Sequence, residues 1–274
     1  MNIIKAHAYG NDFLFVREDQ AGDRDSVELA RITCARNTGV GADGLIVYRR
    51  TESGASMKLF NADGSQAEIS GNAVRCLAAI VLRNEVKAPD YSASLDFEER
   101  RGSQVVIETQ SGNVPLVLLG VADNRYTFRA LMGSPCDIRM FRLDIAGEDV
   151  QVVTLSVGNP HCVILGPPLD EARLRRLGPA LSCHSSFPNG TNVELVEVET
   201  TEKIRILIWE RGVGETSASG TGACAAAVAA MTYSEVEGEV EVISKGGSQR
   251  VEWHDDGLYL TGWAEVSMEG QMFL

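Results

Sequence analysis

A short pattern occurs twice in the sequence: a Ser-Gly turn that leads straight into a run of small and apolar residues. One copy starts at Ser70 and reads SGNAVRCLAAIVL, and the other starts at Ser219 and reads SGTGACAAAVAAM. Because alanine and leucine are strong helix formers, each copy predicts a helix that begins at its turn. The two serines lie 149 residues apart, which predicts a duplicated fold with one such helix in each half.

Three further pairs of polar residues repeat in the same order at nearly the same spacing. The pairs are Asn11 with Asn159, 148 residues apart, and then Asp43 with Asn192 and Asn61 with Glu210, each 149 residues apart. These landmarks favour a duplication over the alternative, which is one large α+β domain with unrelated loops. We therefore expect the polar residues at these landmarks to converge on one cleft between the halves, where ligand sites prefer to lie.

The rest of the chain indicates an α+β protein that is rich in antiparallel strands. Short alternating or apolar runs predict strands in both halves, and four short strands are expected after the second helix. The segment 39–44 matches GxGxxG, but it follows a predicted helix and precedes a predicted strand. A dinucleotide-binding turn has the reverse order, so we reject a Rossmann site.

Composition limits the partners that we expect. The 274 residues carry a formal charge of −13 with a pI of about 4.8, and such an acidic surface repels nucleic acid and anionic membranes. No apolar run is long enough to span a membrane or to act as a signal peptide, which predicts a cytoplasmic protein. The cysteines are scattered without zinc spacing, so no metal is expected.

Six segments in order resemble the diaminopimelate epimerase family. They are KAHAYGNDF, GVGADG, NADGSQAEISGN, VGNPHCV, GTNVE, and ERGVGET with the following SGTGA. The resemblance covers nearly the whole chain and implies an α+β fold of two pseudo-symmetric halves, each a mixed or antiparallel sheet wrapped around a central helix. On this basis we expect an N-terminal half at 1–115, joined by 262–274, and a C-terminal half at 116–261.

The resemblance also implies a reaction. Family members interconvert LL- and meso-diaminopimelate in lysine biosynthesis without a cofactor: one thiolate removes the α-proton, and an opposing thiol returns a proton to the other face. The two thiol positions fall on Ser70 and Ser219, so both are serine in this chain. A serine hydroxyl loses its proton far less readily than a thiol and needs a neighbouring base. The resemblance suggests His161 and Glu210 for that role, and we expect turnover to be impaired or absent.

The candidate substrate-binding residues come from two sources. A turn at a helix N-terminus presents backbone N–H groups and the positive end of the helix dipole to an anion, which points to Gly71-Asn72 and Gly220-Thr221. The resemblance adds residues that contact the amino-acid ends of the substrate: Asn11, Asn61, Asn159, Asn192, Glu210 and Arg211. Arg211 is suited to clamp a carboxylate, and Glu210 to accept from an ammonium group. A glutamine near Gly44, which contacts substrate in some family members, is absent here.

Three interpretations of the double serine stay open. Both thiols were replaced deliberately, so that substrate is held without turnover; or natural drift produced an inactive or altered relative; or the serines carry a slow or different reaction. Three functions also stay open: an epimerase with impaired turnover, a non-catalytic amino-acid-binding protein, and an isomerase of the same fold that acts on another carboxylate. The partner is a small molecule in each case, and a homodimer is an open alternative for the assembly.

Overall fold

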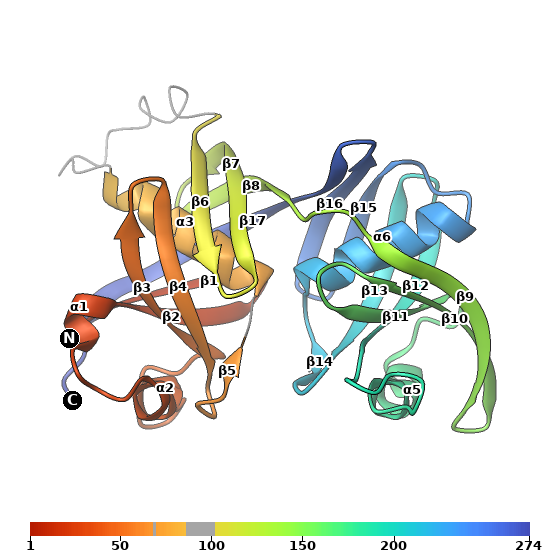
Figure 1. Cartoon of the computed structure of the whole chain (residues 1–274), viewed down its shortest axis with the longest axis horizontal. Helices are drawn as coiled ribbons and strands as arrows, with labels where there is room; N and C mark the ends of the chain where they lie inside the picture. Colours follow the sequence, from red (N-terminus) through yellow and green to blue (C-terminus); the bar gives the residue numbers. More distant parts are fainter. Residues whose placement is uncertain (68–69, 86–101) are drawn as a thin grey trace. The chain divides into compact units, whose positions relative to one another are not determined.

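The chain folds into two compact units (Figure 1). The computed structural model describes residues 1–67, 70–85 and 102–274, with the backbone alone for residues 84 and 85. The N-terminal unit contains Met1–Ala130 and Trp263–Leu274, and the C-terminal unit contains Leu131–Gly262.

The N-terminal unit is built mainly from strands. Buried and exposed residues alternate along strands such as β8, so one face of the strand lies in the core. The strands of the unit are β1 (Asn2–Ala8), β2 (Asn11–Arg17), β3 (Gly44–Thr51), β4 (Gly54–Asn61), β5 (Gln66–Ala67), β6 (Gln104–Thr109), β7 (Gly112–Ala122) and β8 (Arg125–Leu131). Its helices are α1 (Glu18–Ala21), α2 (Ser26–Cys34) and α3 (Gly71–Glu85).

Apart from α1 and β9, the described elements of the C-terminal unit are of the same kinds and in the same order as those of the N-terminal unit. Its strands are β9 (Cys136–Ile145), β10 (Glu148–Ser156), β11 (Pro160–Leu165), β12 (Asn192–Thr200), β13 (Lys203–Glu210), β14 (Gly214–Thr216), β15 (Glu239–Ser244), β16 (Gly247–His254) and the first part of β17 (Gly257–Gln271). Its helices are α5 (Glu171–Ser182) and α6 (Gly220–Tyr233).

Strand pairing repeats from one unit to the other. The pair β2–β3 is parallel and β3–β4 antiparallel, as are β11–β12 and β12–β13 in the C-terminal unit. The next pairs, β4–β6 and β13–β15, are both parallel. The matching order and direction confirm the predicted fold class, a pair of pseudo-symmetric α+β halves with mixed sheets.

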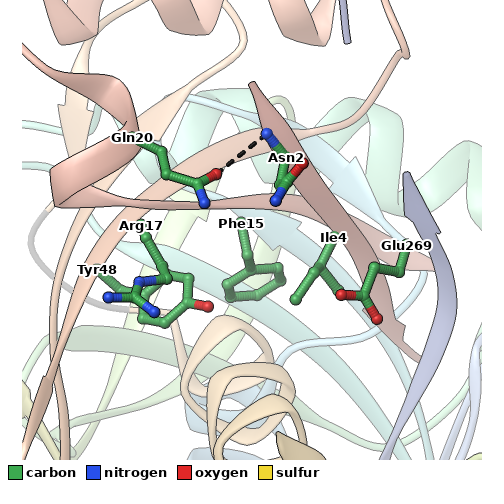
Figure 2. Close-up of a pocket in the computed structure, with 7 residues that line it drawn as sticks. All are labelled: Asn2, Ile4, Phe15, Arg17, Gln20, Tyr48 and Glu269. Carbon is green, nitrogen blue, oxygen red and sulfur yellow. Dashed lines mark hydrogen bonds between the residues drawn. The ribbon is translucent and has the colours of Figure 1, made fainter. Parts of the chain in front are cut away.

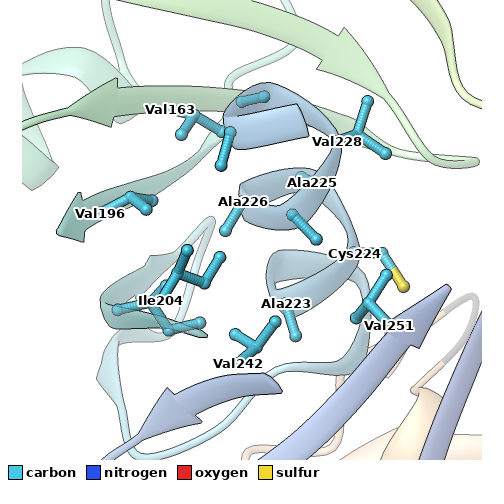
Figure 3. Packing of buried hydrophobic residues seen from close by; sticks show 14 of the residues in the cluster. Val163, Val196, Ile204, Ala223, Cys224, Ala225, Ala226, Val228, Val242 and Val251 are labelled. Atoms are coloured by element: carbon cyan, nitrogen blue, oxygen red, sulfur yellow. The ribbon is translucent and has the colours of Figure 1, made fainter. Parts of the chain in front are cut away.

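A buried helix lies at the centre of each unit. Residues 223–230 of α6 are all fully buried, and α3 is buried on nearly all sides from Ala73 to Leu82. Figure 3 shows the alanines of α6 among strand residues such as Val163, Val196 and Val242. A helix that is apolar all round needs this surrounding, and small alanine side chains let the strands approach closely.

Helices α2 and α5 pack outside the sheets, and each begins at an aspartate cap. Asp25 accepts a hydrogen bond from the Val27 N–H at the start of α2, and Asp170 accepts one from the Arg173 N–H at the start of α5. Helix α2 contacts β3 and β4, and α5 contacts β12 and β13. These helices cover the faces of the sheets that α3 and α6 leave open.

The structure differs from the prediction in the strands that follow α6 and in the boundary between the two units. Within residues 234–274 three strands follow α6, not four short ones, and β17 extends over 15 residues. It is long because its first part pairs with β16 and its last part, from Glu265, pairs with β1. The division expected at 115/116 falls inside β7; the units divide after Ala130 because β7 and β8 form one antiparallel hairpin.

Candidate active site

Both serines of the repeated turn lie at the start of a central helix. The Ser219 Oγ accepts a hydrogen bond from the Gly222 N–H at 3.2 Å, and the Ser70 Oγ accepts one from the Ala73 N–H at 3.4 Å. Each serine is therefore the N-cap of its helix. Ser219 is buried and Ser70 half-buried. The first-turn N–H groups of Gly71-Asn72 and Gly220-Thr221 have no acceptor within their helices and are suited to an anion.

Three polar side chains meet near the start of α6 in the C-terminal unit. Asn159 precedes β11 and directs its Nδ2 at the Thr221 Oγ1, 3.4 Å away. The Asn159 Oδ1 lies 3.0 Å from the His161 Nε2, and the His161 Nδ1 lies 2.8 Å from the Glu194 Oε1. The side chains of His161 and Glu194 are fully buried. Burial raises the pKa of the Glu194 carboxyl, and the neighbouring His161 opposes that rise.

A glycine in α6 makes room for this carboxylate. A Cβ atom at Gly222 would lie 2.9 Å from the Glu194 Oε1 and 3.3 Å from the Ser219 Oγ. Glu194 and Ser219 therefore approach the same point on the helix from two sides. No described residue donates a hydrogen bond to the second Glu194 oxygen, Oε2, although that atom is buried.

Glu210 lies beside Ser219 at the end of β13. Burial raises the pKa of the Glu210 carboxyl above its usual range, and a hydrogen bond with the Ser219 hydroxyl partly offsets the rise. Because the Ser219 oxygen already accepts from the helix, its O–H is the group that this carboxylate can take a proton from.

The next residue, Arg211, is exposed and is anchored at its backbone. Its N–H donates to the Asn192 Oδ1 at 2.9 Å, and the Asn192 Nδ2 donates to the Pro160 carbonyl at 3.0 Å. The Arg211 Nη1 donates to the Asn189 carbonyl at 2.7 Å, which leaves other guanidinium N–H groups for a carboxylate. The C-terminal unit thus brings together all of its predicted residues: Asn159, His161, Asn192, Glu210, Arg211, Ser219, Gly220 and Thr221.

A chain of amide contacts forms the corresponding site in the N-terminal unit. The Asn72 Nδ2 donates to the Asn11 Oδ1 at 3.1 Å, and the Asn11 Nδ2 donates to the Asp43 Oδ2 at 2.8 Å. Behind them, the buried Arg75 donates to the Asn72 Oδ1. Asn61, at the end of β4, donates to the Ser65 Oγ at 2.9 Å. The predicted residues of this unit, which are Asn11, Asn61, Ser70, Gly71 and Asn72, thus lie on neighbouring elements.

Charged groups fix the beginning of β2 in the same unit. The Arg36 Nη2 contacts the Asp12 Oδ1 at 3.0 Å and the Asp43 Oδ1 at 2.7 Å, and the Lys5 Nζ lies 2.8 Å from the Asp12 Oδ2. Burial works to raise the pKa of Asp12, but hydrogen bonds from Lys5 and Arg36 hold that pKa below its usual range. Asp12 is therefore ionised and holds the turn in which Asn11 lies.

Strand register corrects one pair in the sequence repeat. Phe13 pairs with Gly44 across β2–β3, and His161 pairs with Asn192 across β11–β12. The counterpart of Asn192 is therefore Gly44 and not Asp43. A Cβ atom at Gly44 would lie 2.9 Å from the Phe60 carbonyl oxygen, so the backbone leaves no room for a side chain there.

Among the residues that contact predicted site residues, Glu194, Asp43 and Arg75 were not themselves predicted as site residues. Asp43 was noted only as a repeat landmark, and Glu194 only as the last residue of the GTNVE segment. A strand that carries a glutamate among apolar residues (NVELV) was the available signal for Glu194. No sequence signal identified Arg75, because arginine is ordinary in a helix.

The cysteines closest to the two serines along the chain belong to the core. Cys76 in α3 and Cys224 in α6 are both fully buried. Burial raises the pKa of the Cys76 thiol far above its usual range, so this group is not a thiolate near neutral pH. Neither cysteine takes the place of a thiol at position 70 or 219.

A cavity in the N-terminal unit lies apart from the predicted residues. Figure 2 shows the side chains that line it, most of which come from the neighbouring strands β1, β2 and β3, and a hydrogen bond of 3.0 Å from the Asn2 N–H to the Gln20 Oε1. Its lining residues are Asn2, Ile4, Phe15, Arg17, Gln20, Tyr48 and Glu269. None of them is a predicted site residue.

The described part of the chain contains neither a metal-ligand cluster nor a helix that could cross a membrane. Within residues 1–67, 70–85 and 102–274, no three His, Cys, Asp or Glu side chains gather in a way that could hold a metal ion. No helix in this part of the chain combines the length and the apolar character needed to cross a membrane.

Solved structures show which class of protein has this fold. A probable proline racemase from Agrobacterium radiobacter K84 matches with a TM-score of 0.71 at 15% identity, covering 100% of this chain and 93% of its own. A hydroxyproline epimerase from Agrobacterium vitis, with trans-4-hydroxy-L-proline bound, matches with a TM-score of 0.68 at 13% identity, covering 99% and 90%. The fold is thus one that amino-acid racemases and epimerases use.

Sequence comparison then gives the family. The diaminopimelate epimerase family model matches residues 3–135 and 153–267. The diaminopimelate epimerase of Desulforudis audaxviator is 39% identical, covering 99% of both chains, and that of Pelotomaculum thermopropionicum is 37% identical, covering 99% of this chain and 98% of its own. The chain belongs to the diaminopimelate epimerase family, which makes it an isomerase of the racemase and epimerase type.

Proposed function

We propose that this protein binds diaminopimelate and interconverts its LL and meso forms by two-base transfer of the α-proton, without a cofactor, and that serine at both base positions keeps turnover low. One observation carries the proposal: each unit has a Ser-Gly turn at the start of a buried helix, with polar side chains gathered around it. The reaction would serve lysine biosynthesis in the cytoplasm. The proposal requires both turns to act on the same substrate.

The helix starts supply what the reaction needs most. The α-proton next to a carboxylate is only weakly acidic, so removing it requires groups that stabilise the developing negative charge. First-turn N–H groups of α3 and α6 are preorganised donors of this kind, because the helix holds them in place before the substrate arrives. Arg211 adds a guanidinium that can clamp a carboxylate.

The bases are the weak part of the site. A thiol at a helix N-terminus has its pKa lowered from about 8.5 towards neutrality and can serve as base and acid. A serine hydroxyl in that position requires another group to take its proton. In the C-terminal unit Glu210 is in contact with the Ser219 hydroxyl, whereas the described contacts of the Ser70 hydroxyl include no such base. We therefore expect slow turnover, limited at the Ser70 side.

Binding is the first part of the test. Calorimetric titration should show binding of meso-diaminopimelate and weaker binding of proline and hydroxyproline. Arg211→Gln should lower the affinity by roughly tenfold or more, because a hydrogen bond to a charged group contributes about 1.5–3 kcal/mol. Arg205→Gln is the matched control: Arg205 lies on β13, the strand that leads to Arg211, and contacts Glu199 on the surface. Absence of diaminopimelate binding, or equal effects of the two variants, would refute the assignment.

A second function is favoured by the capping role of the serines. Both serine oxygens accept a hydrogen bond from a helix N–H, so serine caps the helix at these positions without taking part in catalysis. A non-catalytic amino-acid-binding protein would retain serine for this capping role. Incorporation of deuterium from solvent at the α-carbon of diaminopimelate separates the two functions. Incorporation above the buffer rate supports catalysis, and binding without incorporation supports the second function.

A further inference from the structure

A buried ionisable pair in the C-terminal unit occupies the place of an apolar pair in the N-terminal unit. The strand register makes His161 of β11 equivalent to Phe13 of β2, and Glu194 of β12 equivalent to Ile46 of β3. All four side chains lie in the protein interior, with at most 4% of any residue exposed. The same two positions of the repeated fold thus hold Phe and Ile in the N-terminal unit and His and Glu in the C-terminal unit.

A third difference accompanies these two. Ala73 is the third residue after Ser70, and Gly222 is the third residue after Ser219. Ala73 is fully buried with its methyl group in place, whereas a Cβ atom at Gly222 would lie 2.9 Å from the Glu194 Oε1. The glycine is therefore the change in the helix that admits the carboxylate.

The equivalent strands and helix of the N-terminal unit pack with Phe, Ile and Ala at these three positions, so the fold can fill them with apolar side chains. Replacing a buried ion pair by apolar residues of similar volume is often neutral or stabilising in other proteins, because burying charge is unfavourable. A buried histidine and glutamate in place of an available apolar solution therefore indicate a role in the site.

The hydrogen bonds around His161 define that role. The Nε2 lies 3.0 Å from the Asn159 Oδ1, which can only accept, so Nε2 carries a proton. The Nδ1 lies 2.8 Å from the Glu194 Oε1, and one further proton lies between these two atoms. The other end of the same Asn159 amide, its Nδ2, points towards Thr221 in the first turn of α6.

The equivalent amide in the N-terminal unit is turned the other way. The Asn11 Oδ1 accepts from Asn72 in the first turn of α3, and its Nδ2 faces Asp43. The unit with the His–Glu pair thus directs an N–H donor at its helix start, and the unit with the apolar pair directs an oxygen.

We propose that Glu194 is a positioning residue: it fixes the His161 ring with its Nε2–H on the Asn159 oxygen, so that the Asn159 amide donates towards the anion-binding start of α6. The carboxylate group of an amino-acid substrate is the ligand that such a donor recognises. Only this choice of ligand rests on the proposed function; the arrangement of the three side chains does not depend on it.

The first experiment introduces the three apolar residues of the N-terminal unit at the equivalent positions of the C-terminal unit. The triple variant His161→Phe/Glu194→Ile/Gly222→Ala should fold with a melting temperature no lower than that of the wild type, and should bind diaminopimelate roughly tenfold or more weakly, as expected for a lost hydrogen bond to a charged group. A triple variant that does not fold, or one that binds as tightly as the wild type, would overturn the inference.

The second experiment measures the protonation of the two His161 ring nitrogens directly and does not depend on turnover. In ¹⁵N NMR spectra of the imidazole, wild-type Nε2 should be protonated and Nδ1 should show a protonated or shared signal. In Glu194→Gln, Nδ1 should shift to the value of an unprotonated ring nitrogen, because the amide of glutamine can donate to it, and affinity should fall. Glu197→Gln, on the same strand with a half-buried side chain, is the matched control and should change neither.

These outcomes separate the two proposals. If the wild type does not bind diaminopimelate, the proposed function fails while the NMR signals still decide the role of Glu194. If wild-type Nε2 is unprotonated, or if Glu194→Gln leaves the Nδ1 signal unchanged, the positioning role is wrong whatever the protein binds.

Discussion

Replacing both serines by cysteine should make the protein less stable and more active at the same time. The stability effect follows from the caps. The Ser219 Oγ accepts the Gly222 N–H at 3.2 Å in a buried position, and the Ser70 Oγ accepts the Ala73 N–H at 3.4 Å in a half-buried one. Sulfur is a weak acceptor, so Ser219→Cys should lose about 1 kcal/mol, the usual contribution of an N-cap. The longer Ser70 contact should contribute less.

The expected shift in melting temperature is small but measurable. For a chain of this size, 1 kcal/mol corresponds to roughly 2–4 °C. The activity effect should be far larger, because a helix N-terminus lowers the pKa of a thiol towards neutrality and general acid–base catalysis contributes roughly 10²–10⁴-fold. The double variant should therefore exchange the α-proton of diaminopimelate at least about a hundredfold faster than the wild type.

The assay combines thermal unfolding with ¹H NMR of diaminopimelate in deuterated water. Ser70→Ala/Ser219→Ala is the matched control, since it removes both caps without adding a thiol. Its melting temperature should fall by a similar amount, and its exchange rate should not rise. If the double cysteine variant binds substrate but exchanges no faster than the double alanine variant, positions 70 and 219 are not the base positions.

Two further predictions concern buried carboxyl groups. Because burial raises the pKa of Glu210 in the folded state, the contribution of this residue to folding stability should be fully present below its unfolded pKa of about 4.3 and should be lost as the pH rises through its folded pKa. Glu210→Gln should remove that decrease in urea titrations across this pH range; an unchanged pH profile would contradict the assignment. Gly222→Ala alone should destabilise the protein by about 1–3 kcal/mol through overpacking against Glu194, whereas Gly120→Ala, where an added Cβ meets no atom within 4 Å, should be nearly neutral. Similar unfolding midpoints for these two glycine variants would show that Glu194 is not held against α6.

The sequence predicted the parts of the fold that repeat. Helices α3 and α6 begin one residue after Ser70 and Ser219, as the Ser-Gly pattern indicates. The spacing also matched Asn11 with Asn159 correctly, because both residues lie next to the first strand of a parallel pair. A strong local signal and a long repeat distance were enough for these features.

Other features depend on contacts between strands, and the spacing of residues along the sequence does not reveal these contacts. Residues 11 and 159 are 148 apart, whereas the serines are 149 apart, so the C-terminal half contains one extra residue between these landmarks. The sequence does not show where that residue lies. The strand register does, and it matches Asn192 to Gly44. Strand β9 was not predicted because charged, exposed residues such as Arg139 and Arg142 interrupt its apolar residues. The apolar neighbours of Glu194 were the only sequence signal for its burial, and they did not outweigh the usual expectation that a glutamate in a strand faces solvent.

The most direct test of the two-base claim is where solvent deuterium first appears. LL-diaminopimelate is incubated with the double cysteine variant in deuterated water, and the deuterium content of substrate and product is measured at early conversion. With two bases on opposite faces of the α-carbon, the meso product should carry deuterium at the inverted centre while the remaining LL substrate stays unlabelled. A product that retains the original proton, or label that enters both isomers equally from the start, would contradict the account.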